Sequence, residues 1–226
     1  MERILHPHSL ATDQLLQRFR PVYHFDKSEG VRLADLGVYA AEGRIEERNA
    51  VTGVLVDMPQ KRLTRAVYFS FFGKDAGLPC LCGLAGVGGH DLDLEAVAVD
   101  FTDDDQVVAV AYLPHGSAEH FRITDRADLS VVLGGRRNRP EVYASRGKHA
   151  HYPCPGTVVR AFGFASDHCD PMPAEDVAMT MATDAMVSAK NIGGLRPGLY
   201  RRALDDMSQL PVLRLGQVKT WRAHKL

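Results

Sequence analysis

Apolar residues in the first two thirds of the chain fall mostly in short runs, or alternate with polar residues between turn residues. Residues 66–72 are apolar almost throughout, which is typical of a central strand that is buried on both faces. Residues 92–101 and 106–113 flank the acidic triplet 103–105 and predict a hairpin. Further short strands are predicted at 22–25, 51–56, 129–133 and 142–145.

Helical patterns occur towards both ends of the chain. Apolar residues spaced for one helix face predict an amphipathic helix over residues 10–20, which Pro21 ends. Residues 173–189 show no strand alternation, and they open with a proline and two acidic residues, as helix N-termini do. A second helix is predicted over residues 197–207.

These patterns predict a mainly β protein, an antiparallel β-sandwich with a helical C-terminal segment. We expect a sandwich domain of residues 1–170 and a helical extension of residues 171–226 packed on it. The 226 residues are 45% hydrophobic and 24% charged, as in soluble globular proteins, and the net charge of −1 argues against nucleic-acid binding. With neither a signal-peptide pattern nor a membrane-spanning apolar run, we expect a cytoplasmic protein without a transmembrane segment. The oligomeric state is left open.

The four cysteines are too few for a disulfide framework in a chain of this length, and no Cys-x-x-Cys pair occurs. Reduced thiols in or near the core are the expected state. A soft-metal site or a single bridge remains an alternative for Cys80, Cys82, Cys154 and Cys169.

Two carboxylates begin the strand predicted at 92–101. In an extended segment Asp93 and Glu95 point to the same face as the valines that follow them. Carboxylates about 5.5 Å apart repel by roughly 3 kcal/mol at an effective dielectric constant of about 20, so a proton, an arginine or a cation must compensate them. His90 follows a glycine-rich loop that can turn its side chain towards them. The alternative is an edge strand with solvated acids.

Four separated segments resemble known families. Residues 89–95 (Gly-His-Asp-Leu-Asp-Leu-Glu) resemble the Gly-His-Arg-His-Asp-Trp-Glu heptapeptide of the necrosis- and ethylene-inducing toxins, and also the His-Glu-Gly-Asp-Trp-Glu of the vacuolar protein sorting protein 62 family. Residues 68–75 are similar to the Tyr-Ser-Trp-Tyr-Phe-Pro-Lys-Asp segment of the toxins. Residues 142–153 and, more loosely, 21–29 are similar to segments of the sorting-protein family. The resemblance spans residues 18–170.

The resemblance implies a β-sandwich with a divalent cation at one end of its sheets. Carried over position by position, the ligands are Asp75, His90, Asp93 and Glu95. Oxygen-rich ligation favours Mg²⁺, Ca²⁺ or Mn²⁺, and additional imidazoles would admit Zn²⁺ or Fe²⁺. The toxins use this site to engage sphingolipid head groups, but the expected cytoplasmic location argues against host-membrane toxicity. Leu94 replaces the tryptophan of both motifs.

Three further residues are candidates for chemistry beside the cation. His149 lies in a segment similar to the sorting-protein family and is a candidate general base. His115, in a Pro-His-Gly segment, is a second candidate, and Arg146 could bind an anionic group. The alternative is that these histidines, together with His151, only satisfy loop carbonyls.

The sequence therefore predicts a divalent-metal-dependent enzyme of hydrolase or lyase type that acts on a polar or anionic small molecule. A non-catalytic, metal-dependent module that binds a lipid, glycan or phosphate head group is the alternative, and so is a scaffold with an empty site.

Overall fold

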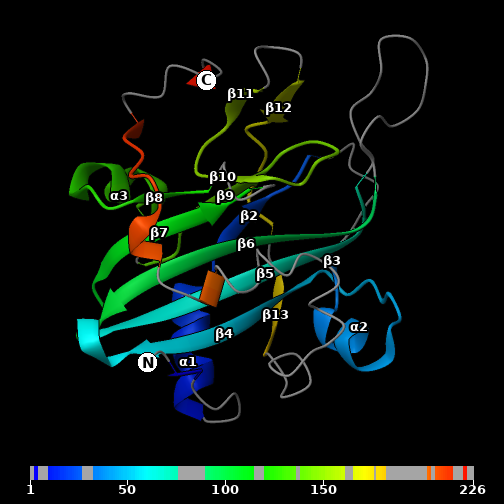
Figure 1. Ribbon diagram of the computed structural model, residues 1–226. Helices are drawn as coiled ribbons and strands as arrows, with labels where there is room; N and C mark the ends of the chain where they lie inside the picture. The colour runs from blue at the N-terminus through cyan, green and yellow to red at the C-terminus, as the bar shows by residue number, and fades with distance from the viewer. Residues whose placement is uncertain are drawn as a thin grey trace.

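The computed structural model describes residues 3–4, 10–26, 33–75, 90–114, 120–135, 138–160, 165–175, 177–181, 203–204, 207–215 and 221–222. Within these residues an eight-stranded sheet forms the main body of the protein (Figure 1). Its strands run in the order β1-β4-β5-β6-β7-β8, with β13 added to β4 and β3 added to β5. They span Arg3–Ile4 (β1), Leu33–Ala34 (β3), Ala50–Met58 (β4), Leu63–Asp75 (β5), His90–Thr102 (β6), Val107–Leu113 (β7), Phe121–Ile123 (β8) and Ala178–Met181 (β13).

Two three-stranded sheets and several helices complete the described structure. One small sheet has the order β10-β9-β2, and the other has the order β12-β11-β14. The strands are β2 (Val22–His24), β9 (Glu141–Ala144), β10 (His151–Tyr152), β11 (Gly156–Arg160), β12 (Ala165–Cys169) and β14 (Trp221–Arg222). The helices are α1 (Leu10–Phe19), α2 (Leu36–Glu42) and α3 (Arg126–Val132), with single 3₁₀ turns η1 (Pro59–Lys61) and η4 (Met207–Gln209).

The central strands β5 and β6 are buried on both faces. One face packs against α1 and the β9–β2 sheet, through residues such as Tyr68, Val97 and Leu16. The other face is covered by α2 and by C-terminal residues such as Met207. Because both faces carry apolar side chains, the middle of β5, residues 66–72, is apolar almost throughout, as the sequence predicts. The mainly β, sandwich-type fold class is confirmed, and no helix in the described ranges is long and apolar enough to cross a membrane.

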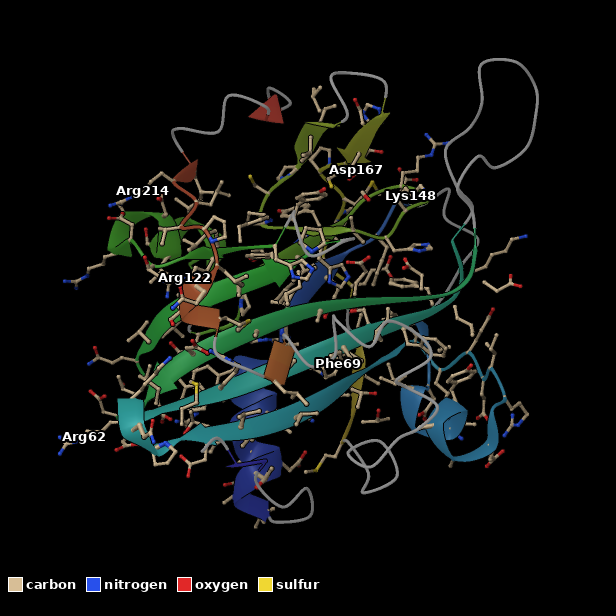
Figure 2. All side chains as sticks on the ribbon, in the orientation of Figure 1. Arg62, Phe69, Arg122, Lys148, Asp167 and Arg214 are labelled. Carbon is tan, nitrogen blue, oxygen red and sulfur yellow. The ribbon has the colours of Figure 1, made fainter. Side chains whose placement is uncertain are left out.

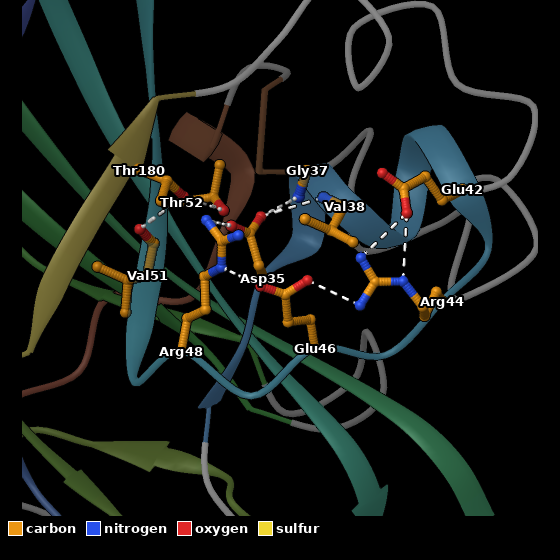
Figure 3. Close-up of polar contacts among 10 residues, drawn as sticks. All are labelled: Asp35, Gly37, Val38, Glu42, Arg44, Glu46, Arg48, Val51, Thr52 and Thr180. Carbon is orange, nitrogen blue, oxygen red and sulfur yellow. Dashed lines mark hydrogen bonds and ion pairs between the residues drawn. The ribbon is translucent and has the colours of Figure 1, made fainter.

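Helix α2 is fixed at its start by a side-chain cap. The Asp35 carboxylate accepts hydrogen bonds from the backbone N–H groups of Gly37 (2.8 Å) and Val38 (3.1 Å), as N-cap residues do (Figure 3). Arg48, which lies just before β4, pairs with the same carboxylate at 3.4 Å. This contact ties the helix to the start of β4, and the exposed ion pairs beside it join Glu42, Arg44 and Glu46.

The strand predicted at 129–133 is wrong, because these residues lie in or directly after α3. Asp125 caps this helix by accepting from the backbone N–H groups of Ala127 (3.0 Å) and Asp128 (3.3 Å). Arg214, which lies beside α3 in Figure 2, pairs with Asp125 and lowers the pKa of that carboxyl. The Asp125 cap favours a helix at this point, and its effect is stronger than the strand preference of the short apolar run 129–133.

The helix predicted over 173–189 is wrong for its described central part, where residues Ala178–Met181 form β13. This strand pairs in parallel with the edge of β4, with Thr180 opposite Thr52. The two threonine hydroxyl oxygens lie 3.2 Å apart, and the backbone N–H of Ala178 donates to the carbonyl of Asn49. The edge of β4 offers hydrogen-bond partners to the backbone N–H and C=O groups of residues 178–181, so these residues do not need a helix to satisfy them. Residues 203–204 are helical, in agreement with the second predicted helix, whose range lies mostly outside the described residues.

Candidate functional site

Asp93 and Glu95 are completely buried on one face of β6. In the β5–β6 ladder Phe72 lies directly opposite Asp93, and Ser70 lies directly opposite Glu95. The next pair on this face joins Tyr68 and Val97, which both belong to the apolar core. The two carboxylates therefore begin a face that continues into the core, and the alternative of a solvated edge strand is excluded. Burial of two neighbouring carboxylates carries a large desolvation cost that another group has to compensate.

His149 contacts the first of these carboxylates. Its Nδ1 atom lies 3.3 Å from Oδ2 of Asp93, and both side chains are fully buried. The imidazole ring also stacks on the ring of Phe72, with centroids 4.0 Å apart and an interplanar angle of 9°. One histidine of the predicted set is thus placed against one predicted ligand, although the two are 56 positions apart in the chain.

Left-handed backbone occurs on both sides of this contact. His149 has a φ of +55°, and Leu92, the residue before Asp93, has a φ of +65°. The loop that carries His149 is held in place by two backbone hydrogen bonds, from His149 N–H to the Ser145 carbonyl (2.8 Å) and from Ser145 N–H to the Ala150 carbonyl (2.9 Å). A left-handed conformation costs a non-glycine residue about 1–2 kcal/mol, and such conformations gather at functional sites. The surrounding structure therefore holds Asp93 and His149 together against local backbone preference.

Three further buried side chains lie beside Phe72 or opposite Glu95 and in contact with one another: His151, Ser70 and Tyr23. His151 packs edge-on against Phe72 and Tyr23, with ring centroids 6.5 Å and 5.6 Å apart. The hydroxyl of Ser70 donates to the hydroxyl of Tyr23 at 3.1 Å. Sequence reasoning did not include Tyr23 and Ser70 in the site. The available signal was Ser70 itself, the one hydroxyl residue in the run 66–72 other than Tyr68.

The structure describes the remaining predicted residues only in part. Asp75 and His90 are Cα partners at the end of the β5–β6 ladder, three residue pairs beyond the pair Phe72–Asp93. Their side chains lie outside the described structure. His115 also lies outside the described residues. Arg146 is exposed in the loop that carries His149, and its backbone N–H donates to the carbonyl of His168 at 2.9 Å.

The donor types at this end of β6 fit a hard divalent cation, because carboxylate oxygens are accompanied by imidazole nitrogens. Among the described residues, however, no three side chains of His, Cys, Asp or Glu converge closely enough to hold a metal ion. Asp93 and Glu95 supply two oxygen-bearing groups. Completion of a ligand set from the predicted residues depends on Asp75 and His90.

The thiols that the structure describes do not form a bridge. Cys154 and Cys169 are free cysteines, and Cys80 and Cys82 lie outside the described residues. Burial raises the pKa of the Cys154 thiol to about 12 and raises that of Cys169 well above its ordinary value. Both thiols are therefore protonated at neutral pH and poorly suited to bind a metal or to act as nucleophiles.

Comparisons with known proteins find similarity in three-dimensional structure. No family model matches the chain, and no curated protein matches its sequence. Among solved structures, NLPPya in complex with mannosamine aligns with 16% identity and a TM-score of 0.49, covering 80% of this chain and 81% of that one. A structure described as a toxin fold for microbial attack and plant defense aligns with 15% identity and a TM-score of 0.49, over 81% and 80% of the two chains. The non-toxic HaNLP3 protein aligns with 15% identity and a TM-score of 0.48, over 90% and 84%.

These structures belong to the necrosis- and ethylene-inducing toxin-like group, one of the two groups that the sequence motifs resemble. At these identities and TM-scores the likeness carries no argument about activity or ligand. The resemblance to the vacuolar protein sorting protein 62 family stays a prediction.

Proposed function

We propose that the protein is a divalent-cation-dependent enzyme of hydrolase or lyase type, which acts on a polar or anionic small molecule beside β6. The observation that carries this proposal is the burial of Asp93 and Glu95 on one strand face, with the His149 imidazole 3.3 Å from Asp93. Two adjacent buried carboxylates attract a cation, and a buried imidazole beside them can hold or release a proton. A site that only bridged an ion to a ligand would not need this imidazole.

In this proposal the cation ligands and the proton-transfer group are different residues. Asp93 and Glu95 would hold the cation together with Asp75 and His90, and the oxygen-rich set favours Mg²⁺, Ca²⁺ or Mn²⁺ over Zn²⁺ or Fe²⁺. A bound divalent cation supplies Lewis-acid polarisation of a substrate oxygen. His149 moves a proton at Nε2, since its Nδ1 atom faces Asp93.

Two further residues act on the substrate. Arg146 is exposed three residues before His149, and it would bind an anionic substrate group through paired N–H donors. His115 is proposed as a second proton-transfer group.

A second candidate function is metal-dependent binding of a lipid, glycan or phosphate head group without turnover. The observation that favours it is the basic character of the loop beside the acids. Arg146 is exposed and Lys148 extends half-buried from the same loop (Figure 2), so a cation and two basic side chains could share one anionic group.

The two functions are separated by an assay for turnover. Metal-free protein is incubated with Mn²⁺ or Mg²⁺ and with p-nitrophenyl phosphate, bis(p-nitrophenyl) phosphate and p-nitrophenyl acetate, each with and without a chelator. The enzyme proposal expects chelator-sensitive release of p-nitrophenol from at least one ester, with loss of release in His149→Asn. If no ester is turned over, and the protein instead sediments with anionic vesicles only when the cation is present, the enzyme proposal is wrong and the binding function holds.

A further inference from the structure

We propose that Tyr23 and Ser70 form a buried hydroxyl pair that positions the Glu95 carboxylate for cation binding. The inference rests on the proposed cation site and assigns positioning residues to it. Tyr23 comes from β2, in a different sheet from Ser70 and Glu95, so the pair also connects the small sheet to the site.

The first support is the place of Ser70 in the ladder. Ser70 and Glu95 are direct Cα partners on adjacent antiparallel strands, and both are completely buried. Directly opposed side chains in such a pair have Cβ atoms about 4.5–5.5 Å apart and lie on the same face. A hydroxyl at this distance can reach a carboxylate oxygen on the longer glutamate side chain.

The second support is the number of protons that the pair carries. Ser70 and Tyr23 bring one hydroxyl hydrogen each, and the 3.1 Å hydrogen bond between them uses one of the two. Rotation of the two hydroxyl groups reverses this bond without moving a heavy atom. Tyr23 then donates to Ser70, and Ser70 donates to the carboxylate that lies opposite. The pair can therefore serve as a fixed donor to Glu95.

Tyr23 is suited to this role because it stays protonated and is held rigidly. Full burial raises the pKa of Tyr23 far above that of a solvated tyrosine, so the phenol is a neutral donor at any physiological pH. Its backbone carbonyl accepts from the Glu175 N–H at 2.8 Å, and its strand pairs with β9 through Val142. The ring of His151 packs edge-on against it at 5.6 Å.

Tyr68 offers a matched control on the same face of the sheet. It is also completely buried, but its hydroxyl donates to the backbone carbonyl of Leu16 at 2.7 Å, and it lies opposite Val97 instead of a carboxylate. Loss of its hydroxyl removes a buried hydrogen bond of similar kind, at one residue pair further from the acids. A merely structural role for Tyr23 predicts similar effects of Tyr23→Phe and Tyr68→Phe.

The test is calorimetric titration of Mn²⁺ into metal-free wild-type protein and into the variants Tyr23→Phe, Ser70→Ala and Tyr68→Phe. Each variant is first checked for folding by its melting temperature in chelator. Removal of a group that orients a metal ligand weakens metal affinity about 10–100-fold, so we expect a Kd raised by about that factor in Tyr23→Phe and Ser70→Ala. The double variant Tyr23→Phe/Ser70→Ala should have a Kd for Mn²⁺ no higher than that of the weaker-binding single variant, because both changes interrupt the same chain of hydroxyl donors. Tyr68→Phe should bind as the wild type does.

The outcomes separate this inference from the proposal on which it rests. If wild-type protein binds Mn²⁺ and Tyr23→Phe binds it as tightly as Tyr68→Phe does, the positioning role is wrong and the cation site stands. If the wild type itself does not bind Mn²⁺, the cation site is wrong, and the positioning role falls with it. Ser70→Ala removes a single oxygen from a small side chain, so it decides the question even if Tyr23→Phe folds poorly.

Discussion

The Nδ1 atom of His149 lies 3.3 Å from Oδ2 of Asp93, and neither side chain has any exposed surface. His149 itself and Leu92, the residue before Asp93, adopt left-handed backbone conformations. A contact between two titratable groups, buried together and supported by strained backbone, is typical of functional sites more than of ordinary core packing. It links the strand that carries the acids to the loop that carries Arg146.

Replacement of His149 separates its backbone role from its chemical role. Asparagine tolerates the left-handed conformation better than alanine does, so His149→Asn should be about 1 kcal/mol more stable than His149→Ala. Both variants lose the ring that stacks on Phe72, and both should keep bound cation while losing turnover. Urea unfolding and elemental analysis check the two statements. Retained turnover in either variant would contradict a proton-transfer role.

The acids should affect thermal stability in opposite directions with and without the cation. In chelator, Asp93→Asn and Glu95→Gln should melt at or above the temperature of the wild type, because each removes one of two adjacent buried charges. With free Mn²⁺ at about 100 times Kd, only the wild type should gain about 3 kcal/mol of stability. Melting curves in both buffers check this. A wild type that is indifferent to Mn²⁺, or variants that gain as much, would be inconsistent with the proposed ligands.

Gly134 and Gly135 form a matched pair for a test of packing beside β9. Both have a positive φ, +56° and +67°, so alanine is strained at either position. A Cβ atom at Gly134 would also clash with the side chain of Glu141, while a Cβ at Gly135 meets nothing within 4 Å. We expect Gly135→Ala to cost about 1–2 kcal/mol and Gly134→Ala about 1–3 kcal/mol more. Equal losses in urea unfolding would show that Glu141 moves aside freely.

Buried thiols and phenols should make the protein less stable at alkaline pH. The pKa of Cys154 is raised from 9.0 to about 12 in the folded state, so above pH 9 the unfolded chain releases a proton that the folded chain keeps. This contribution to stability is complete below pH 9 and is lost as the pH rises towards 12. Cys154→Ala should therefore lessen, without abolishing, the fall in stability between pH 9 and 11, since Tyr23, Tyr68 and Cys169 contribute in the same direction. Urea unfolding at several pH values measures it, and an unchanged slope would contradict it.

The four strands β4 to β7 of the main sheet could be predicted because their pattern is local. The apolar run 66–72 lies within β5, and the acidic turn at 103–105 lies between β6 and β7, as alternation and turn chemistry indicate. The shared face of Asp93 and Glu95 followed from strand alternation alone. α3 was missed because one cap residue, Asp125, decided between helix and strand in a short apolar segment.

The remainder depends on contacts between distant parts of the chain. β13 is a strand because the edge of β4 offers backbone hydrogen-bond partners, and the residue types at 178–181 do not predict this pairing. The sequence predicts only that Tyr23 lies in an extended segment, and the pairing of β2 with β9 is what brings its hydroxyl to Ser70. Likewise, His149 approaches Asp93 from a left-handed backbone conformation that only a few per cent of non-glycine residues adopt, so the sequence does not predict it.

Equilibrium dialysis of metal-free protein against Mn²⁺, followed by elemental analysis, tests the central claim most directly. The wild type is compared with the double variant Asp93→Asn/Glu95→Gln. The control is Asp100→Asn, which removes a carboxylate further along β6, where Asp100 pairs with Arg65 of β5. We predict that the wild type and the control retain Mn²⁺ close to one ion per chain, and that the double variant retains almost none. Equal Mn²⁺ content in the wild type and the double variant would contradict the assignment of Asp93 and Glu95 as the centre of the site.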